Sequence, residues 1–139
     1  MTTLLHSAPN EWQVIYDLSK DVALVSQVQR ATLETEDFGL IPDAALFGSP
    51  EWWRAVGSDI IPRHSVKGVI SRVFESGDSA WPLFEVDSNG EKTVWTRFGD
   101  ATQYRVGQHV RIDYVEQRPK KSWTGSVVQN EILLIAVRD

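Results

Sequence analysis

Apolar positions recur at helical spacing in the first part of the chain and at strand spacing after residue 62. Between residues 22 and 33 they fall three or four residues apart, which predicts an amphipathic helix. Ser19 or Asp21 precedes it as a candidate N-cap. The stretch "SPEWWRAVG" (49–57) predicts a two-turn helix, because a Ser stands before a Pro and a Gly closes the segment. Between the two helices, residues 38–50 contain two Gly and two Pro and predict an irregular connector.

The stretch "NEWQVIYDL" (10–18) fits two patterns. Some of its apolar residues have helical spacing, and others alternate as in a strand. We favour a helix, because Ser7 and Pro9 are typical of the entry into one.

After residue 62 the chain predicts five strands. In "HVRIDYV" Val110, Ile112 and Tyr114 alternate with Arg111 and Asp113. In contrast, "EILLIAVR" has so many consecutive apolar residues that we expect it to be buried on both faces. Gly68 indicates a bulge or bend in the first strand, and Asn89-Gly90 predicts a tight hairpin turn. The predicted strands are 64–75, 81–87, 92–98, 109–115 and 131–138.

The run "YRVGQHVRIDYVEQRPKKSW" (104–123) resembles the fourth strand and the following loop of OB-fold barrels, in which an aromatic and a Gly-containing turn often precede an alternating strand. The resemblance covers residues 64–137 at the level of architecture, and SH3-like barrels enter a strand in the same way. The helices here precede the strands, whereas OB folds often carry one after strand three. The resemblance implies a five-stranded antiparallel small β-barrel. We therefore predict one α+β domain, residues 1–139, with a helical segment (8–58) packed on a β-barrel (63–138).

The composition of the chain excludes several kinds of functional site. The chain has 139 residues and no Cys, which excludes disulfides, thiolate zinc sites and a cysteine nucleophile and suits a cytoplasmic protein. No apolar run approaches the roughly 18 residues of a membrane span. The net charge is −5, and it is uneven: residues 1–60 carry nine acidic and three basic side chains, and residues 61–139 carry ten and eleven.

Catalytic motifs are missing from the sequence. It contains no G-x-S-x-G, no phosphate-binding glycine loop, no dinucleotide fingerprint and no H-E-x-x-H. The three His lack the local spacing of metal ligands. We expect neither an enzyme, nor a metal site, nor a cofactor.

Two binding functions remain. In the first, the chain is a protein-binding module, plausibly an acidic inhibitor or immunity-type protein that neutralises a basic partner. Acidic residues would steer the partner through complementary charge, and aromatic residues would anchor it. The residues predicted for this surface are Glu34, Glu36, Asp37, Asp43, Phe47 and Trp53.

In the alternative, the barrel binds single-stranded nucleic acid. Trp95 and Arg97 alternate on one strand, and the "RPKKSWTG" stretch places basic residues beside a tryptophan. Aromatic rings stack on bases and cations contact phosphates. The overall acidity opposes this hypothesis. Its predicted face consists of Trp95, Arg97, Arg111, Arg118, Lys120, Lys121 and Trp123.

Overall fold

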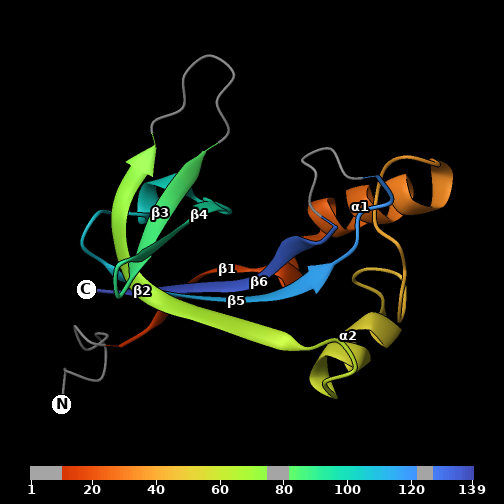
Figure 1. The fold of residues 1–139 in the computed structure, drawn as a ribbon, viewed down its shortest axis with the longest axis horizontal. Helices are drawn as coiled ribbons and strands as arrows, with labels where there is room; N and C mark the ends of the chain where they lie inside the picture. The colour runs from red at the N-terminus through yellow and green to blue at the C-terminus, as the bar shows by residue number, and fades with distance from the viewer. Residues whose placement is uncertain (1–10, 75–81, 122–126) are drawn as a thin grey trace. The chain divides into compact units, whose positions relative to one another are not determined.

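The computed structural model describes residues 11–74, 82–121 and 127–139, which form two compact units (Figure 1). Within the described residues, the first unit comprises 11–16, 65–74, 82–112 and 134–139, and the second comprises 17–64, 113–121 and 127–133. Among the described residues, no helix has the length and apolar character needed to cross a membrane.

The two helices begin at the caps that the sequence predicts. α1 spans Val22–Glu34, and the Asp21 carboxylate accepts a hydrogen bond from the Leu24 amide at 3.1 Å. α2 spans Pro50–Gly57, and the Ser49 hydroxyl accepts from the Trp52 amide at 3.1 Å. Both caps satisfy amide groups that have no partner within their own helix. The irregular connector between the helices is confirmed.

The strands form one six-stranded sheet in the order β1-β6-β5-β2-β3-β4. Asn89 and Gly90 adopt positive φ angles of 54° and 92° in the turn between β3 and β4, which confirms the predicted hairpin. Two 3₁₀ turns, η2 (Leu18–Lys20) and η3 (Ala101–Gln103), lie between longer elements. The strands are β1 (Gln13–Asp17), β2 (Arg63–Phe74), β3 (Leu83–Ser88), β4 (Glu91–Thr96), β5 (His109–Gln117) and β6 (Gln129–Arg138).

The helix predicted in residues 10–18 is wrong. Residues Gln13–Asp17 form β1, which is the neighbour of β6 in the sheet. Tyr16 is buried and stacks on Phe98 with ring centroids 4.8 Å apart. The alternating pattern therefore predicted the structure correctly. The local sequence fits a helix and a strand about equally well, and pairing with β6 stabilises the strand.

The barrel prediction is not confirmed. The α+β class and the antiparallel pairing of β2 with β3 and of β3 with β4 are present. However, no pairing between β1 and β4 closes the sheet within the described residues. The resemblance to OB-fold and SH3-like barrels therefore extends only as far as a small, largely antiparallel sheet that follows an α-helical stretch.

The first unit packs its core on the side of β4 that we expected to face solvent. Trp95 is 8% exposed and Val94 is 51% exposed, the reverse of the predicted orientation. The reason is the register of the hairpin, which pairs Trp95 with Phe84 and Val94 with Glu85. Phe84 is fully buried and packs on Tyr104. Directly opposed residues share a face of the sheet, so Trp95 follows Phe84 into the core.

The second unit is built around Trp52 of α2. The Trp52 ring is fully buried, and its Nε1 donates to Oε1 of Gln117 on β5 at 3.1 Å. Phe47 packs edge-on against the same ring, with centroids 4.8 Å apart. A second buried polar group lies nearby on β5, where the Asp113 carboxylate contacts Arg63 at 2.7 Å. These partners satisfy polar atoms that would otherwise destabilise the core.

Candidate functional site

The segment after α1 is held by side chains from the end of β5. The Lys120 ammonium donates to the backbone carbonyls of Thr32 and Thr35, the latter at 2.6 Å. A cation at this position satisfies carbonyls at the C-terminal end of α1 and complements the helix dipole. The backbone of Lys120 also donates to the Gly39 carbonyl at 3.1 Å. The end of α1 is therefore fixed by a residue more than 80 positions later in the chain.

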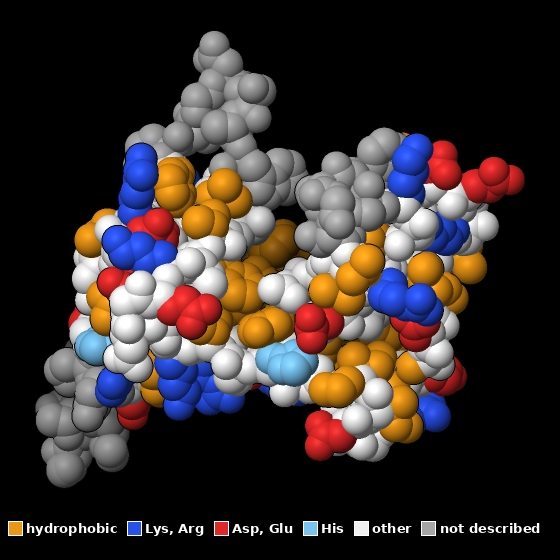
Figure 2. Space-filling model, viewed as in Figure 1, with side chains coloured by type: hydrophobic (Ala, Val, Ile, Leu, Met, Phe, Trp, Pro, Cys, Tyr) orange, Lys and Arg blue, Asp and Glu red, His pale blue; other side chains and the backbone are white. Residues whose placement is uncertain are grey.

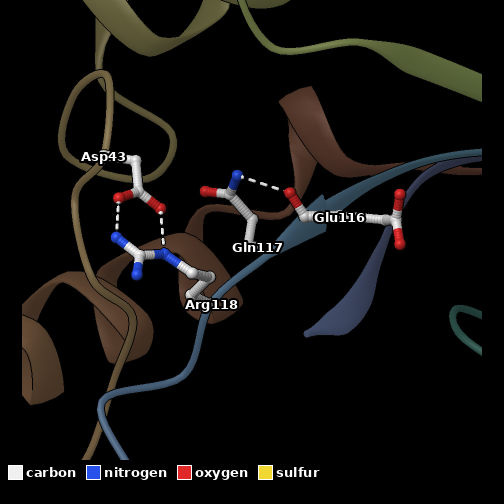
Figure 3. A network of polar contacts seen from close by, with 4 residues as sticks. All are labelled: Asp43, Glu116, Gln117 and Arg118. Atoms are coloured by element: carbon white, nitrogen blue, oxygen red, sulfur yellow. Dashed lines mark hydrogen bonds and ion pairs between the residues drawn. The ribbon is translucent and has the colours of Figure 1, made fainter. Parts of the chain in front are cut away.

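A bidentate ion pair fixes the same segment further along. Arg118 donates through Nε to Oδ2 of Asp43 at 2.9 Å and through a second nitrogen to Oδ1 (Figure 3). The Arg118 hydrogen bond lowers the pKa of Asp43 below its usual range. An isolated antiparallel bridge joins Leu40 to Pro119, and the Ile41 amide donates to the Arg118 carbonyl at 2.7 Å. Residues 39–41 therefore run antiparallel to residues 118–120, as a short two-stranded ribbon within the one chain.

Hydrogen bonds also shape the turn that follows α1. The Thr35 hydroxyl contacts the Ala31 carbonyl at 2.7 Å and accepts from the Phe38 amide at 3.0 Å. The Thr32 hydroxyl accepts from the Leu40 amide at 3.1 Å. Local side-chain-to-backbone bonds of this kind replace the helical pattern where a helix ends.

This turn exposes acidic and apolar side chains together. Phe38 is 55% exposed and Leu33 is 71% exposed. Glu34, Glu36 and Asp37 are also exposed. Figure 2 shows Asp and Glu side chains gathered over the C-terminal end of α1, at the upper right. We call Leu33, Glu34, Glu36, Asp37 and Phe38 the acidic tip.

Negative charge is concentrated in the second unit, which contains the acidic tip. The second unit carries eleven acidic and seven basic side chains, whereas the first carries eight and seven. The second unit therefore holds −4 of the net charge of −5. The closest basic residue on α1, Arg30, pairs with Glu34 at a long distance of 3.8 Å, and both side chains are largely exposed. Solvent screens such a pair, so the acidic character of the tip is retained.

Three residues of the predicted protein-binding surface lie outside the acidic tip. Phe47 is 2% exposed and packs on Trp52, so the expectation that it contacts a partner is wrong. The Asp43 carboxylate is committed to Arg118. Trp53 is half-buried and lies edge-on to Trp52 at 4.9 Å. Sequence reasoning missed Phe38, although its neighbours Asp37 and Gly39 indicated a turn.

The predicted nucleic-acid face is largely occupied by contacts within the protein. Trp95 is buried and its Nε1 donates to the Thr93 hydroxyl at 2.7 Å. The Arg97 guanidinium donates to the carbonyls of Phe74, Leu83 and Ala101. The Arg118 guanidinium contacts Asp43, and the Lys120 ammonium contacts the carbonyls of Thr32 and Thr35. Arg111 is half-buried, Lys121 is exposed, and Trp123 lies outside the described residues.

Within the described ranges, no three or more His, Asp or Glu side chains are grouped so as to hold a metal ion. The exposed His64 contacts Glu116 at 3.3 Å and stacks on Tyr114, and both contacts are structural.

Comparison with known protein families identifies the chain. A family model described as Immunity protein RhsI2 matches residues 12–137. The chain belongs to this family of immunity proteins. Its role is thus that of an immunity-type protein, which binds another protein, a toxin. A comparison with curated proteins found no match.

The family match decides between the two binding hypotheses. It supports the protein-binding module of the sequence analysis, and no observation supports the nucleic-acid alternative. It does not identify an OB-fold family. Residues 12–137 include both units, so the assignment covers the acidic tip as well as the sheet.

Proposed function

We propose that this RhsI2-family protein neutralises its toxin by direct stoichiometric binding, without a chemical step, and that the acidic tip is a contact surface for a basic region of that toxin. The observation that carries the proposal is the exposure of Phe38 beside Glu36 and Asp37 on a turn that is already ordered. The lack of Cys suits a reducing compartment, so we place the encounter in the cytoplasm.

The aromatic and acidic residues would contribute differently to binding. Phe38 offers an apolar ring that a partner can cover, and buried aromatic anchors dominate the energy of many interfaces. The carboxylates of Glu34, Glu36 and Asp37 would attract a basic partner during diffusion and so raise the association rate. Trp53, half-exposed on α2, is retained as a further aromatic contact.

Preorganisation strengthens the case for the acidic tip. Lys120, Thr32 and Thr35 fix the backbone of the turn before any partner arrives. Association then costs less conformational entropy than it would for a free loop. Asp43 pairs with Arg118, and we assign it to positioning the connector rather than to direct contact.

The test uses the toxin domain that this chain is proposed to neutralise. Co-expression with the wild-type chain is expected to restore growth, and the purified pair is expected to elute as one complex of fixed stoichiometry. Growth that is restored by the chain without any complex would overturn direct binding.

The surface assignment requires a variant and a matched control. The double substitution Glu36→Lys and Asp37→Lys is expected to slow association, with a larger effect at low salt. Glu91→Lys, exposed on β4 in the first unit, is the control for the single substitution Glu36→Lys, because both change the net charge by the same amount. If the acidic-tip variant associates as fast as the wild-type chain, the tip is not the contact surface.

A further inference from the structure

A groove of about 480 Å³ opens on the sheet within the first unit. Its lining follows the strand order: Trp12 just before β1, Arg138 at the end of β6, His109 at the start of β5, Lys67 and Val69 on β2, and Asp87 on β3. Nothing in the immunity assignment accounts for this groove.

Strand geometry places these side chains on a common face. Lys67, Val69 and Ser71 alternate along β2, so they project to the same side. Val69 pairs with Asp87 of β3, and the Ile70 amide donates to the Gln108 carbonyl at 2.9 Å, beside His109. The groove is therefore a property of the folded sheet rather than of one loop.

Gly68 allows β3 to approach β2 closely along the groove. A Cβ atom at this position would lie 2.4 Å from the Asp87 carbonyl oxygen and 2.8 Å from a methyl group of Val86. Any side chain would force the two strands apart. The glycine predicted to mark a bulge thus serves a close backbone contact, and the register shift lies further along, between Ile70 and Arg72.

Lys67 and Arg138 outnumber the one carboxylate, Asp87, in the lining of the groove, although the protein is acidic. Lys67 and His109 are exposed, and the Arg138 guanidinium lies 5.0 Å from the centre of the Trp12 ring. This distance is that of a cation–π contact, which fixes both side chains. Trp12 remains 38% exposed. The groove therefore presents positive charge beside an accessible aromatic ring.

The acidic groups on this face already have hydrogen-bond donors. Asp87 accepts from the Gly90 amide at 2.8 Å in the β3–β4 turn. Glu85, two residues earlier on β3, accepts from the Ser71 hydroxyl at 2.8 Å. These hydrogen bonds engage one oxygen of each carboxylate, and Lys67 and Arg138 add two positive charges to the lining of the groove.

We propose that this groove is a second toxin contact, which receives an acidic segment of the toxin. A carboxylate of that segment pairs with Lys67 and Arg138, and an adjoining apolar side chain covers the Trp12 ring. A protein segment fits better than a small anion, because Trp and Arg are the residue types most enriched among energetically dominant interface residues. The inference rests on the proposed binding of a toxin, but not on the acidic tip being its other contact.

The experiment measures the dissociation constant of an inactivated toxin domain for four full-length chains: wild type, Lys67→Glu, Trp12→Ala and the control Lys92→Glu. Lys67 and Lys92 are both exposed strand residues of the first unit, and only Lys67 lines the groove. We expect Lys67→Glu and Trp12→Ala each to weaken binding at least about tenfold, and Lys92→Glu to bind like the wild type. Circular dichroism and thermal unfolding verify that each variant is folded.

The outcomes separate this inference from the proposed function. If the wild-type chain does not bind the toxin, the proposed function fails. If the wild-type chain binds and both groove variants bind equally well, the groove inference is overturned and the proposed function stands. Equal weakening by Lys67→Glu and Lys92→Glu would also overturn the inference, because it would reflect total charge.

Discussion

The Arg118 guanidinium contacts both carboxylate oxygens of Asp43, 75 residues away in the sequence, and so links the end of β5 to the connector between α1 and α2. This pair and the Lys120 contacts give the "RPKKSWTG" stretch a structural role at its beginning. Of its three cations, Lys120 holds the end of α1 beside the acidic tip, and Arg118 holds Asp43 in the connector that follows. The basic stretch and the acidic surface, which the sequence presents as competing sites, are parts of one arrangement.

The Asp43–Arg118 pair predicts a pH-dependent contribution to stability. Because Arg118 lowers the pKa of folded Asp43, the pair stabilises the protein above the usual carboxyl range near pH 4, and this contribution is lost as the pH falls through the lowered value. Asp43→Asn is therefore expected to unfold at a lower temperature than wild type at pH 7. The two proteins should converge in strong acid. The difference will be small because both groups are exposed.

Thermal unfolding between pH 2.5 and 7 measures this convergence. Glu36→Gln is the control, since Glu36 is an exposed carboxylate of the same turn. If the difference in unfolding temperature between Asp43→Asn and wild type stays constant across this pH range, the ionised pair is not the cause of that difference.

Phe38 predicts a second effect, on the complex rather than on folding. Phe38→Ala is expected to weaken toxin binding at least about tenfold, chiefly through faster dissociation, because the ring supplies area that only the complex buries. Stability should barely change, since the ring is already 55% exposed. Leu33→Ala removes a similarly exposed side chain and tests how far the contact extends.

Binding kinetics measured on a surface that carries the inactivated toxin domain give the association and dissociation rate constants separately. An unchanged dissociation rate for Phe38→Ala would contradict its role as an anchor. A lower unfolding temperature with unchanged affinity would assign Phe38 to folding instead.

Sequence patterns predicted the features that depend on near neighbours. The caps of α1 and α2 and the Asn89-Gly90 turn are local, because hydrogen bonds within a few residues determine them. The strand at 13–17 was missed because its stability comes from β6, more than 100 residues later. An alternating pattern also defines two faces of a strand but does not show which face is buried. The burial of Trp95 could be assigned only once its pairing with the buried Phe84 was known.

The candidate site was less predictable than the fold. The acidity of the acidic tip is visible in the sequence, and the exposure of Glu34, Glu36 and Asp37 agrees with it. Which aromatic residue accompanies them was not visible, because Phe38 and Phe47 both lie in the same Gly- and Pro-containing connector and each precedes a glycine. Only tertiary packing distinguishes the two residues, because the Phe47 ring packs against the buried Trp52 ring.

The core contact between Trp52 and Gln117 predicts a large loss of stability on substitution. Trp52→Phe removes the indole Nε1 and leaves the buried Gln117 Oε1 without this donor, and it also leaves a void. The two effects together are expected to cost about 3 kcal/mol of unfolding free energy. Trp53→Phe, next in the chain and half-buried, should cost much less. Urea unfolding of the two variants provides the comparison, and similar midpoints would contradict the central role of Trp52.

Glu131 on β6 predicts the opposite pH behaviour from Asp43. Burial raises the pKa of this carboxyl, and a hydrogen bond from Gln129 opposes the rise only in part. A raised folded pKa favours the protonated form, so stability is greatest below the usual carboxyl range and is lost as the pH rises through the raised value. Glu131→Gln, which cannot ionise, is expected to be more stable than wild type at pH 7 by a few degrees. The gain should vanish near pH 4, whereas the exposed control Glu91→Gln should match the wild type throughout. A Glu131→Gln protein that is less stable than wild type at pH 7 would instead show that the ionised carboxylate stabilises β6.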